Sequence, residues 1–165
     1  MRFPKSHRLL YSLLISLLGV CLFGFGQEAE KIQVQTVKVA ENVFMLVGGG
    51  GNIGVSTGPD GILLIDSQFA ELMEKIKAEI AKIQSGPVRI VCNTNWHYDH
   101  ISSNEVLAKE GALVIAHENT RKGMASEQNF PEFGQKLPAY PEAALPVVTF
   151  KESLTLYFNG DDHFS

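Results

Sequence analysis

The sequence predicts an α+β fold, and three patterns along the chain indicate it. Short β-rich runs come first, at residues 32–39 and 43–47, and the first alternates apolar and polar side chains as a half-buried strand does. An amphipathic helical pattern follows over 68–84, with apolar residues recurring along one face. Further apolar runs at 88–93 and 113–116 then predict a second set of strands.

The connections between these elements have their own signals. Residues 52–57 and 61–66 are expected to form a hairpin, because the turn sequence Gly-Pro-Asp-Gly joins them at 58–61. The second arm is almost continuously apolar, which favours a strand covered on both faces. Ser67 is expected to cap the first turn of the helix, and Gly-Pro at 86–87 to end it.

The remaining segments have less specific sequence signals. The glycine run at 48–51 predicts a turn, and a second helix is expected to begin at 104–109. Prolines throughout 123–146 predict a long irregular lid or surface segment. Residues 147–150 and 154–158 are expected to pair as two terminal strands.

The first 26 residues are expected to be a secretory signal peptide. An apolar run over 9–25 follows three basic residues, and Gly24 and Gly26 supply small residues before a cleavage point. The alternatives are an uncleaved membrane anchor or a lipid attached at Cys21, so a membrane contact is expected only in those cases. In each case the rest of the chain, 27–165, leaves the cytoplasm and is periplasmic or secreted.

Composition excludes several classes of protein. The 165 residues are 45% apolar and 19% charged, which suits a packed core. The first 26 residues hold three of the 14 basic residues and none of the 18 acidic ones, so the remainder carries a formal charge of −7. That charge argues against a nucleic-acid partner. Cys21 and Cys92 cannot form a disulfide scaffold, and Cys92 is expected to be a buried strand thiol.

Side chains that suit a divalent metal ion crowd together directly after the strand at 88–93. His97, Asp99 and His100 lie within four positions, and imidazole nitrogen with carboxylate oxygen suits an ion of the zinc type. His97 and Asp99 would share one face of an extended chain, while His100 needs a turn to converge on the same point. The alternative is a polar loop whose histidines are solvated.

Residues 93–100 read Asn-Thr-Asn-Trp-His-Tyr-Asp-His, and Asn104 follows four residues later. With these residues the chain resembles the metallo-β-lactamase superfamily, whose signature H-x-H-x-D-H follows a buried strand. Other segments resemble the N-terminal hairpins of that family, its strand-end aspartate and its later strands: 52–55, 58–61, 64–66, 112–118 and 147–156. The resemblance extends over residues 34–158.

The resemblance implies an αββα metallo-β-lactamase sandwich, of which residues 27–165 would form the N-terminal half only. It implies a zinc-dependent hydrolase in which a metal-bound hydroxide attacks the carbonyl of a small ester, lactam, lactone or thioester. The implied metal ligands are His97, Asp99 and His100, and the implied catalytic residues are His97 and Asp99. One or two zinc ions are expected.

Two departures from the family pattern open an alternative. Asn95 occupies the position of the first signature histidine, and amides are poor zinc ligands, so one metal position is weakened. A mono-zinc subclass of the family also has asparagine there, and in that arrangement His97 is free to act as a general base. The later ligand motif of the family is missing from the 165 residues. The alternative is therefore a truncated or pseudo-enzyme chain, with redox or thioester chemistry as a third possibility.

The sequence also predicts roles for several other side chains. His163 is a weak candidate ligand, and His117 is expected to be structural. Asp66 is expected to hydrogen-bond a ligand rather than bind the metal. Trp96 and Tyr98 flank the signature residues and are either pocket walls or packing residues.

Overall fold

Residues 31–130, 135–160 and 163–164 are described by a computed structural model of the chain. The chain divides into two units, 1–33 and 34–165, and the second contains the sheet. The expected signal peptide at 1–26 lies outside the described residues. Over the described ranges, no helix combines the length and the apolar character needed to cross a membrane.

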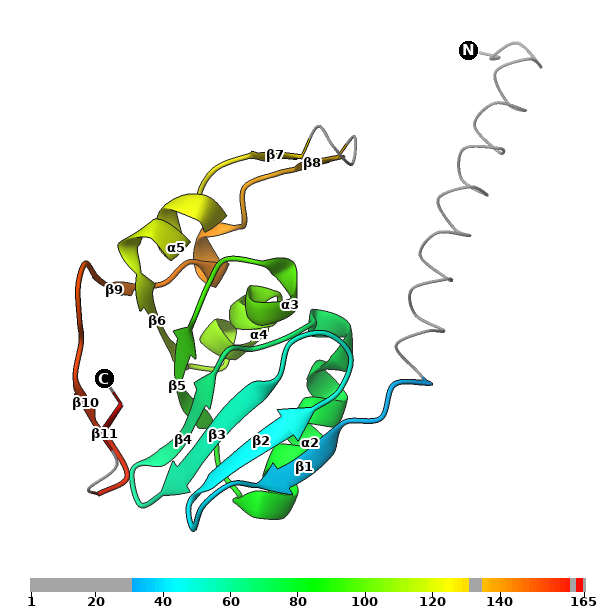
Figure 1. Cartoon of the computed structure of the whole chain (residues 1–165), viewed down its shortest axis with the longest axis vertical. Coiled ribbons are helices and arrows are strands. Elements are labelled where there is room, and N and C mark those ends of the chain that lie inside the picture. Colours follow the sequence, from blue (N-terminus) through cyan, green and yellow to red (C-terminus); the bar gives the residue numbers. More distant parts are fainter. Residues whose placement is uncertain (1–30, 131–134, 161–162, 165) are drawn as a thin grey trace, which may run out of the picture. The chain divides into compact units, whose positions relative to one another are not determined.

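A seven-stranded mixed sheet organises the second unit (Figure 1). Its order is β1-β2-β3-β4-β5-β6-β9. The pairs from β1 to β4 are antiparallel, and those from β4 through β5 and β6 to β9 are parallel. The strands have these bounds: β1 (Gln35–Lys38), β2 (Val43–Val47), β3 (Ile53–Gly58), β4 (Gly61–Ile65), β5 (Val88–Asn93), β6 (Leu113–His117) and β9 (Val148–Phe150). The predicted α+β class is confirmed.

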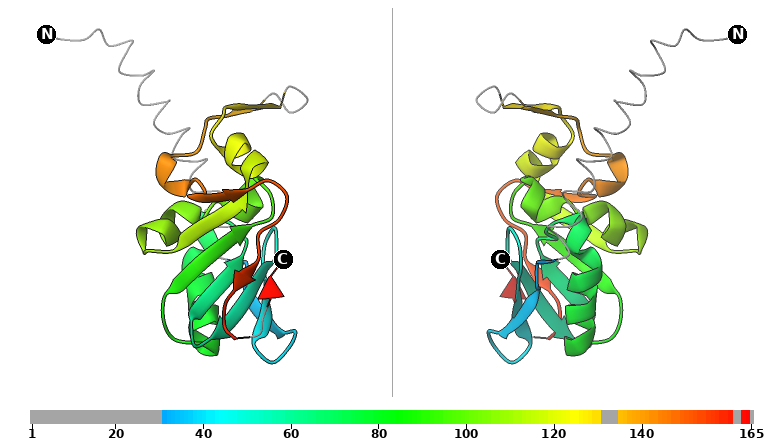
Figure 2. Two further views of the ribbon diagram at one scale, coloured as in Figure 1. Left: turned by 90° about the vertical axis from the view of Figure 1, so that its left-hand side faces the viewer. Right: turned by 90° about the vertical axis from the view of Figure 1, so that its right-hand side faces the viewer.

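Helices cover one side of this sheet, and the C-terminal hairpin lies on the other (Figure 2). The principal helix, α2, buries Met73, Ile76 and Ile80, which belong to the apolar stripe that predicts it. The helices have these bounds: η1 (Ala70–Leu72), α2 (Met73–Ile83), α3 (Tyr98–Ile101), α4 (Asn104–Lys109), α5 (Glu118–Met124) and η3 (Glu142–Ala144). The hairpin consists of β10 (Leu156–Tyr157) and β11 (His163–Phe164).

The core is centred on β4. Ile62, Leu63 and Leu64 are each 0% exposed. Because neighbouring residues of a strand point to opposite faces, the burial of all three means that both faces of β4 are covered. This agrees with the apolar run in the sequence. β4 is also where the sheet changes character, since it pairs with β3 antiparallel and with β5 parallel.

The connection from β4 to α2 differs from the expectation. Ser67 does not cap the helix, because α2 begins later, after η1, and neither helix start has a side-chain cap. The Ser67 hydroxyl donates instead to Asn104 Oδ1 at 2.8 Å. Asp66 and Gln68 on either side have φ of 66° and 54°, in the left-handed region that non-glycine residues usually avoid. These two residues turn the chain sharply at the end of β4.

The C-terminal segments also differ from the expectation. Residues 147–150 and 154–158 do not pair with each other: β9 extends the main sheet beside β6, whereas β10 pairs with β11. Residues 123–146 are not wholly irregular, since β7 (Gln128–Phe130) and β8 (Gln135–Leu137) form an antiparallel ladder. Tertiary packing decides which distant strand such a segment joins, and short β-rich runs do not specify that partner by themselves.

Asn159 joins the C-terminal hairpin to the turn between β3 and β4. Its backbone N–H donates to Asp60 Oδ2 at 2.7 Å, and its side chain accepts from Asp60 N at 3.1 Å and donates to Ser56 Oγ at 3.2 Å. Gly58 is needed for this approach, because a Cβ there would lie 2.7 Å from Asn159 Cβ. We call this contact the Asn159 clamp.

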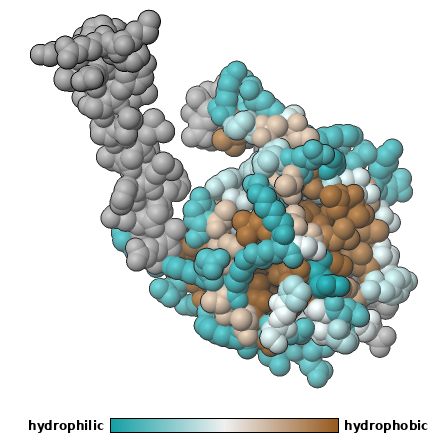
Figure 3. Space-filling view, turned by 180° about the vertical axis from the view of Figure 1, so that it is seen from behind, coloured by the Kyte–Doolittle hydropathy of each residue, from teal (hydrophilic) through white to brown (hydrophobic). Residues whose placement is uncertain are grey.

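Apolar side chains reach the surface in places. The view from behind shows a broad hydrophobic area beside a largely hydrophilic one (Figure 3). Leu113 and Val147 are 41% and 70% exposed, and they lie near each other because Val147 N donates to Val114 O.

Cys92 lies on β5 and is half-buried rather than fully buried. Burial, and after it the charge of Asp66, raises the pKa of its thiol from 9.0 to about 11. The thiolate is therefore disfavoured in the folded chain.

Alkylation of Cys92 is expected to be slow in the folded chain at pH 9 and to accelerate as the pH approaches 11. The unfolded thiol ionises first, so the stability tied to this group is present below the unfolded pKa and is lost as pH rises through the folded value. Iodoacetamide labelling of a Cys21→Ser chain, folded and in urea, measures this. Equal rates in both states at pH 9 would contradict the expectation.

Candidate metal site

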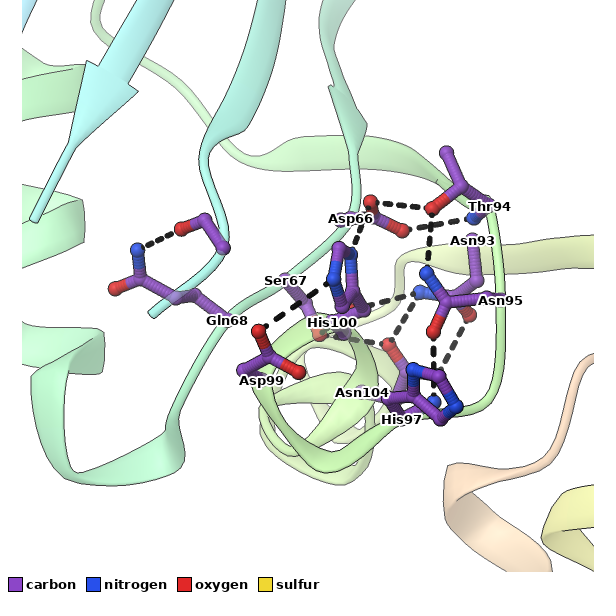
Figure 4. Close-up of polar contacts among 11 residues, drawn as sticks. Asp66, Ser67, Gln68, Asn93, Thr94, Asn95, His97, Asp99, His100 and Asn104 are labelled. Atoms are coloured by element: carbon purple, nitrogen blue, oxygen red, sulfur yellow. Dashed lines mark hydrogen bonds and ion pairs between the residues drawn. The ribbon is translucent and has the colours of Figure 1, made fainter. Parts of the chain in front are cut away.

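The candidate site lies where β4 and β5 end. Three segments meet there: residues 66–68 after β4, the loop 94–97 with the first turn of α3 after β5, and the glycine loop 48–51 between β2 and β3. β4 and β5 are parallel, so their carboxyl ends share one edge of the sheet, which is where open α/β sheets place ligand sites. Figure 4 shows the polar side chains of the first two segments gathered at this edge.

His100 is held by Asp66. Its Nδ1 lies 2.7 Å from Asp66 Oδ2, and the Asp66 carboxylate also accepts from Thr94 N at 2.8 Å and Thr94 Oγ1 at 2.7 Å. Asp66 is only 4% exposed, so these contacts replace its water. A carboxylate on Nδ1 makes that nitrogen the donor and leaves Nε2 with a free lone pair. The pair therefore presents Nε2 of His100 as a possible metal ligand.

Asp99 lies on the free side of the same ring. Its Oδ2 is 3.5 Å from His100 Nε2, so one carboxylate oxygen and one imidazole nitrogen face a common point. Both side chains are partly exposed, at 36% and 24%, which leaves this point open to solvent. Carboxylate oxygen and imidazole nitrogen are both zinc ligands.

His97 does not join this pair. It is exposed at the start of α3, and its ring packs edge-on against Trp96 with the ring centroids 4.9 Å apart. Figure 4 shows its ring apart from Asp99 and His100. The Asn95 side chain accepts the His97 backbone N–H at 2.8 Å, so Asn95 shapes the turn through its oxygen.

The donors therefore fit a zinc ion in part. Across residues 31–130, 135–160 and 163–164, no group of three or more His, Cys, Asp or Glu side chains is arranged to hold a metal. Asp99 and His100 supply two ligands of the four that a tetrahedral zinc takes. Of the three predicted ligands, the structure brings Asp99 and His100 together and leaves His97 apart, and their ligand roles stay predictions.

Asn104 ties the loop to the rest of the fold. It is 0% exposed, donates to Asn93 Oδ1 at 2.8 Å and to Ala144 O at 3.2 Å, and accepts from Ser67 Oγ at 2.8 Å. Asn93 completes the network by donating to His100 O at 3.3 Å. The signature contains Asn93 and Asn104 but not their mutual contact, which depends on how α4 meets β5.

The structure also places the other residues for which the sequence predicts a role. His117 Nδ1 accepts Asn119 N, and its Nε2 donates to Lys151 O, so both nitrogens have backbone partners. Trp96 packs on the buried cluster of Ile101, Met124, Ala144 and Leu145. Tyr98 donates to Glu71 at 3.0 Å, and burial raises its pKa. His163 belongs to β11, and the structure describes its backbone only.

A mixed sheet with helices on one side and a His–Asp pair beyond a parallel strand defines an α+β protein with a candidate metal site at a sheet edge. The family model described as the metallo-beta-lactamase superfamily matches residues 39–164. The chain therefore belongs to the metallo-β-lactamase superfamily. A search of curated proteins finds no match.

Solved structures of similar fold include metallo-β-lactamases of subclass B3. BJP-1 of Bradyrhizobium japonicum is 21% identical with a TM-score of 0.65, over 79% of this chain and 50% of that one. FEZ-1 of Legionella gormanii is 15% identical with a TM-score of 0.66, over 78% and 50%. The di-zinc LRA-12 from an Alaskan soil metagenome is 19% identical with a TM-score of 0.63, over 78% and 50%. The chain thus spans about half the length of these enzymes.

Proposed function

We propose that the chain is the N-terminal, ligand-bearing part of a zinc-dependent hydrolase acting on small molecules with an ester, lactam, lactone or thioester carbonyl. The observation that carries the proposal is the Asp66–His100–Asp99 arrangement where β4 and β5 end. A buried carboxylate orients the imidazole, and an accessible carboxylate lies at its free nitrogen, as metal-binding histidines require. Superfamily membership supports the same reaction class.

In this proposal Asp99 and His100 hold zinc, and further groups or water molecules would complete its coordination. A bound zinc ion would polarise a carbonyl and lower the pKa of a water molecule. Asp66 holds the His100 ring in place and fixes the proton on Nδ1. His97 would act as the general base, its exposed imidazole accepting a proton from water. The signal-like pattern of 1–26 supports a periplasmic or secreted location.

A chain that binds zinc weakly and catalyses nothing is the second candidate. The observation that favours it is that only two donors converge among residues 31–130, 135–160 and 163–164. Asn95 also favours this second candidate, because its side-chain oxygen already accepts a hydrogen bond from the His97 backbone N–H.

Hydrolysis assays separate the two candidates. The full-length chain, supplied with zinc, is expected to hydrolyse at least one member of a panel of β-lactams, lactones, esters and thioesters. Chelation is expected to abolish that activity and added zinc to restore it. A zinc-loaded chain that hydrolyses none of the four classes would support the non-catalytic candidate instead.

A further inference from the structure

The glycine loop 48–51 lies directly against the Asp99–His100 edge of the candidate site. A Cβ at Gly51 would lie 2.9 Å from Asp99 O and 3.3 Å from His100 Nε2. A Cβ at Gly50 would lie 3.1 Å from Asp99 Cβ, and Gly50 has a φ of +88°. The loop thus occupies the space beside the free nitrogen of His100 with backbone alone. Its position decides how much room remains at that nitrogen.

The Gln68 side chain holds this loop. Its Nε2 donates to Gly51 O, and both atoms of its amide lie within 3.6 Å of the position a Cβ would take at Gly48 (Figure 4). The backbone of Gln68 is fixed too. Its backbone carbonyl oxygen accepts from Ser103 N at 3.2 Å and from Ser103 Oγ at 3.4 Å. Gln68 therefore connects the start of α4 to the glycine loop.

Gln68 is also an unfavourable residue for its place. It is 1% exposed, it has a φ of 54°, and its Oε1 is the one buried side-chain oxygen or nitrogen without a hydrogen-bond partner in the part of the chain that the structure describes. Strained backbone and unpaired buried polar atoms both reduce stability, and in native proteins they concentrate at functional sites. Glycine would relieve the backbone strain but could not reach Gly51.

We propose that Gln68 is a positioning residue of the metal site: its amide holds Gly51 beside His100 Nε2 and so keeps the two-ligand edge in a shape that admits the ion. The consequence for zinc rests on the proposed function, whereas the placement of the loop does not. The Gln68 amide donates to Gly51 rather than to Asp99 or His100, so it acts on the ligands through the loop.

The matched control is Gln84, whose Nε2 donates to Gly58 O at 3.0 Å at the other end of the sheet. Gln68→Ala and Gln84→Ala each remove one glutamine-to-glycine hydrogen bond, but only the first is at the site. Gln68→Gly removes the same bond while suiting the left-handed backbone, so it gives a folded test chain if Gln68→Ala unfolds. Two measurements are made on full-length chains: amide hydrogen exchange over 48–52, and zinc affinity by competition with a chromophoric chelator.

Faster exchange over 48–52 in both Gln68 variants, with zinc affinity reduced about tenfold and no change in Gln84→Ala, is the expected result. Unchanged exchange over 48–52 would overturn the proposal, and so would unchanged affinity in a chain that binds zinc. If the unmodified chain binds no zinc, the proposed function fails, and the exchange result alone decides whether Gln68 holds the loop.

Discussion

Asp99→Ala is expected to weaken zinc binding by the chain by more than about 100-fold. Outer residues that merely orient a ligand typically contribute about 10- to 100-fold to metal affinity, so removing Asp99, a proposed ligand, should exceed that range. Asp99 supplies the carboxylate oxygen near His100 Nε2, at 3.5 Å, whereas Asp66 occupies the opposite nitrogen. Without Asp99 a neutral imidazole is left to hold a dication. Competition with a chromophoric chelator measures the loss.

Glu71→Ala is the matched control, because Glu71 is a nearby carboxylate that accepts from Tyr98 Oη rather than from His100. Its zinc affinity should equal that of the unmodified chain. Asn95→His is the complementary change and is expected to raise the zinc content toward two ions, because it restores an imidazole at the weakened position. Full zinc affinity in Asp99→Ala would refute the site, and the loop would then be a solvated polar turn.

Asn104→Ala is expected to lower the free energy of unfolding by about 2–4 kcal/mol. The side chain is fully buried, and its removal leaves Asn93 Oδ1 and Ala144 O without this donor, while the Ser67 hydroxyl keeps only its longer contact to His100 O. A buried polar group that loses its hydrogen bond carries its desolvation penalty uncompensated. Urea unfolding followed by circular dichroism measures the change.

Asn119 provides the comparison for this experiment, because it is exposed on α5. Asn119→Ala should change the free energy of unfolding by less than about 0.5 kcal/mol, as surface substitutions usually do. Asn104→Asp keeps the shape of the side chain but sets a buried carboxylate against the acceptor oxygens of Asn93 and Ala144, so it should be at least as destabilising as Asn104→Ala. A loss below about 1 kcal/mol for Asn104→Ala would show that the network does not fix the loop.

The fold class and the positions of most strands along the chain follow from local patterns. The apolar stripe of α2 and the continuous run of β4 each bury their side chains as the sequence indicates. Predictions from local patterns fail where the contacts of a residue or strand depend on a partner that is distant in the sequence. Ser67 has the composition of a helix cap but donates to Asn104, and β9 adds to the sheet beside β6 rather than to the next segment. Neither partner is visible in the local sequence.

The candidate site, too, is predicted by the local sequence only in part. The density of His97, Asp99 and His100 indicates a metal, and their ligand roles remain predictions. The structure brings Asp99 and His100 together and separates His97, because the turn made by Asn95 directs the ring toward Trp96. Gln68 has no sequence signal, since a glutamine after a strand is ordinarily exposed. Only its burial, its φ and its reach to Gly51 reveal it.

The Asn159 clamp has a consequence for how the chain tolerates change. The clamp and the buried core of β4 both hold the sheet together, and neither uses a candidate metal ligand. The clamp lies at the Gly58–Gly61 end of β4, whereas Asp66 lies at the opposite end. The Asn159 clamp and the candidate metal site therefore lie at opposite ends of β4, and the effects of substitutions at the two places should be additive. A domain that folds only around its metal cannot lose a ligand and survive. Here the sheet forms with Asn95 at the position where the family signature has a histidine, so the packing of the sheet does not depend on a ligand at that position.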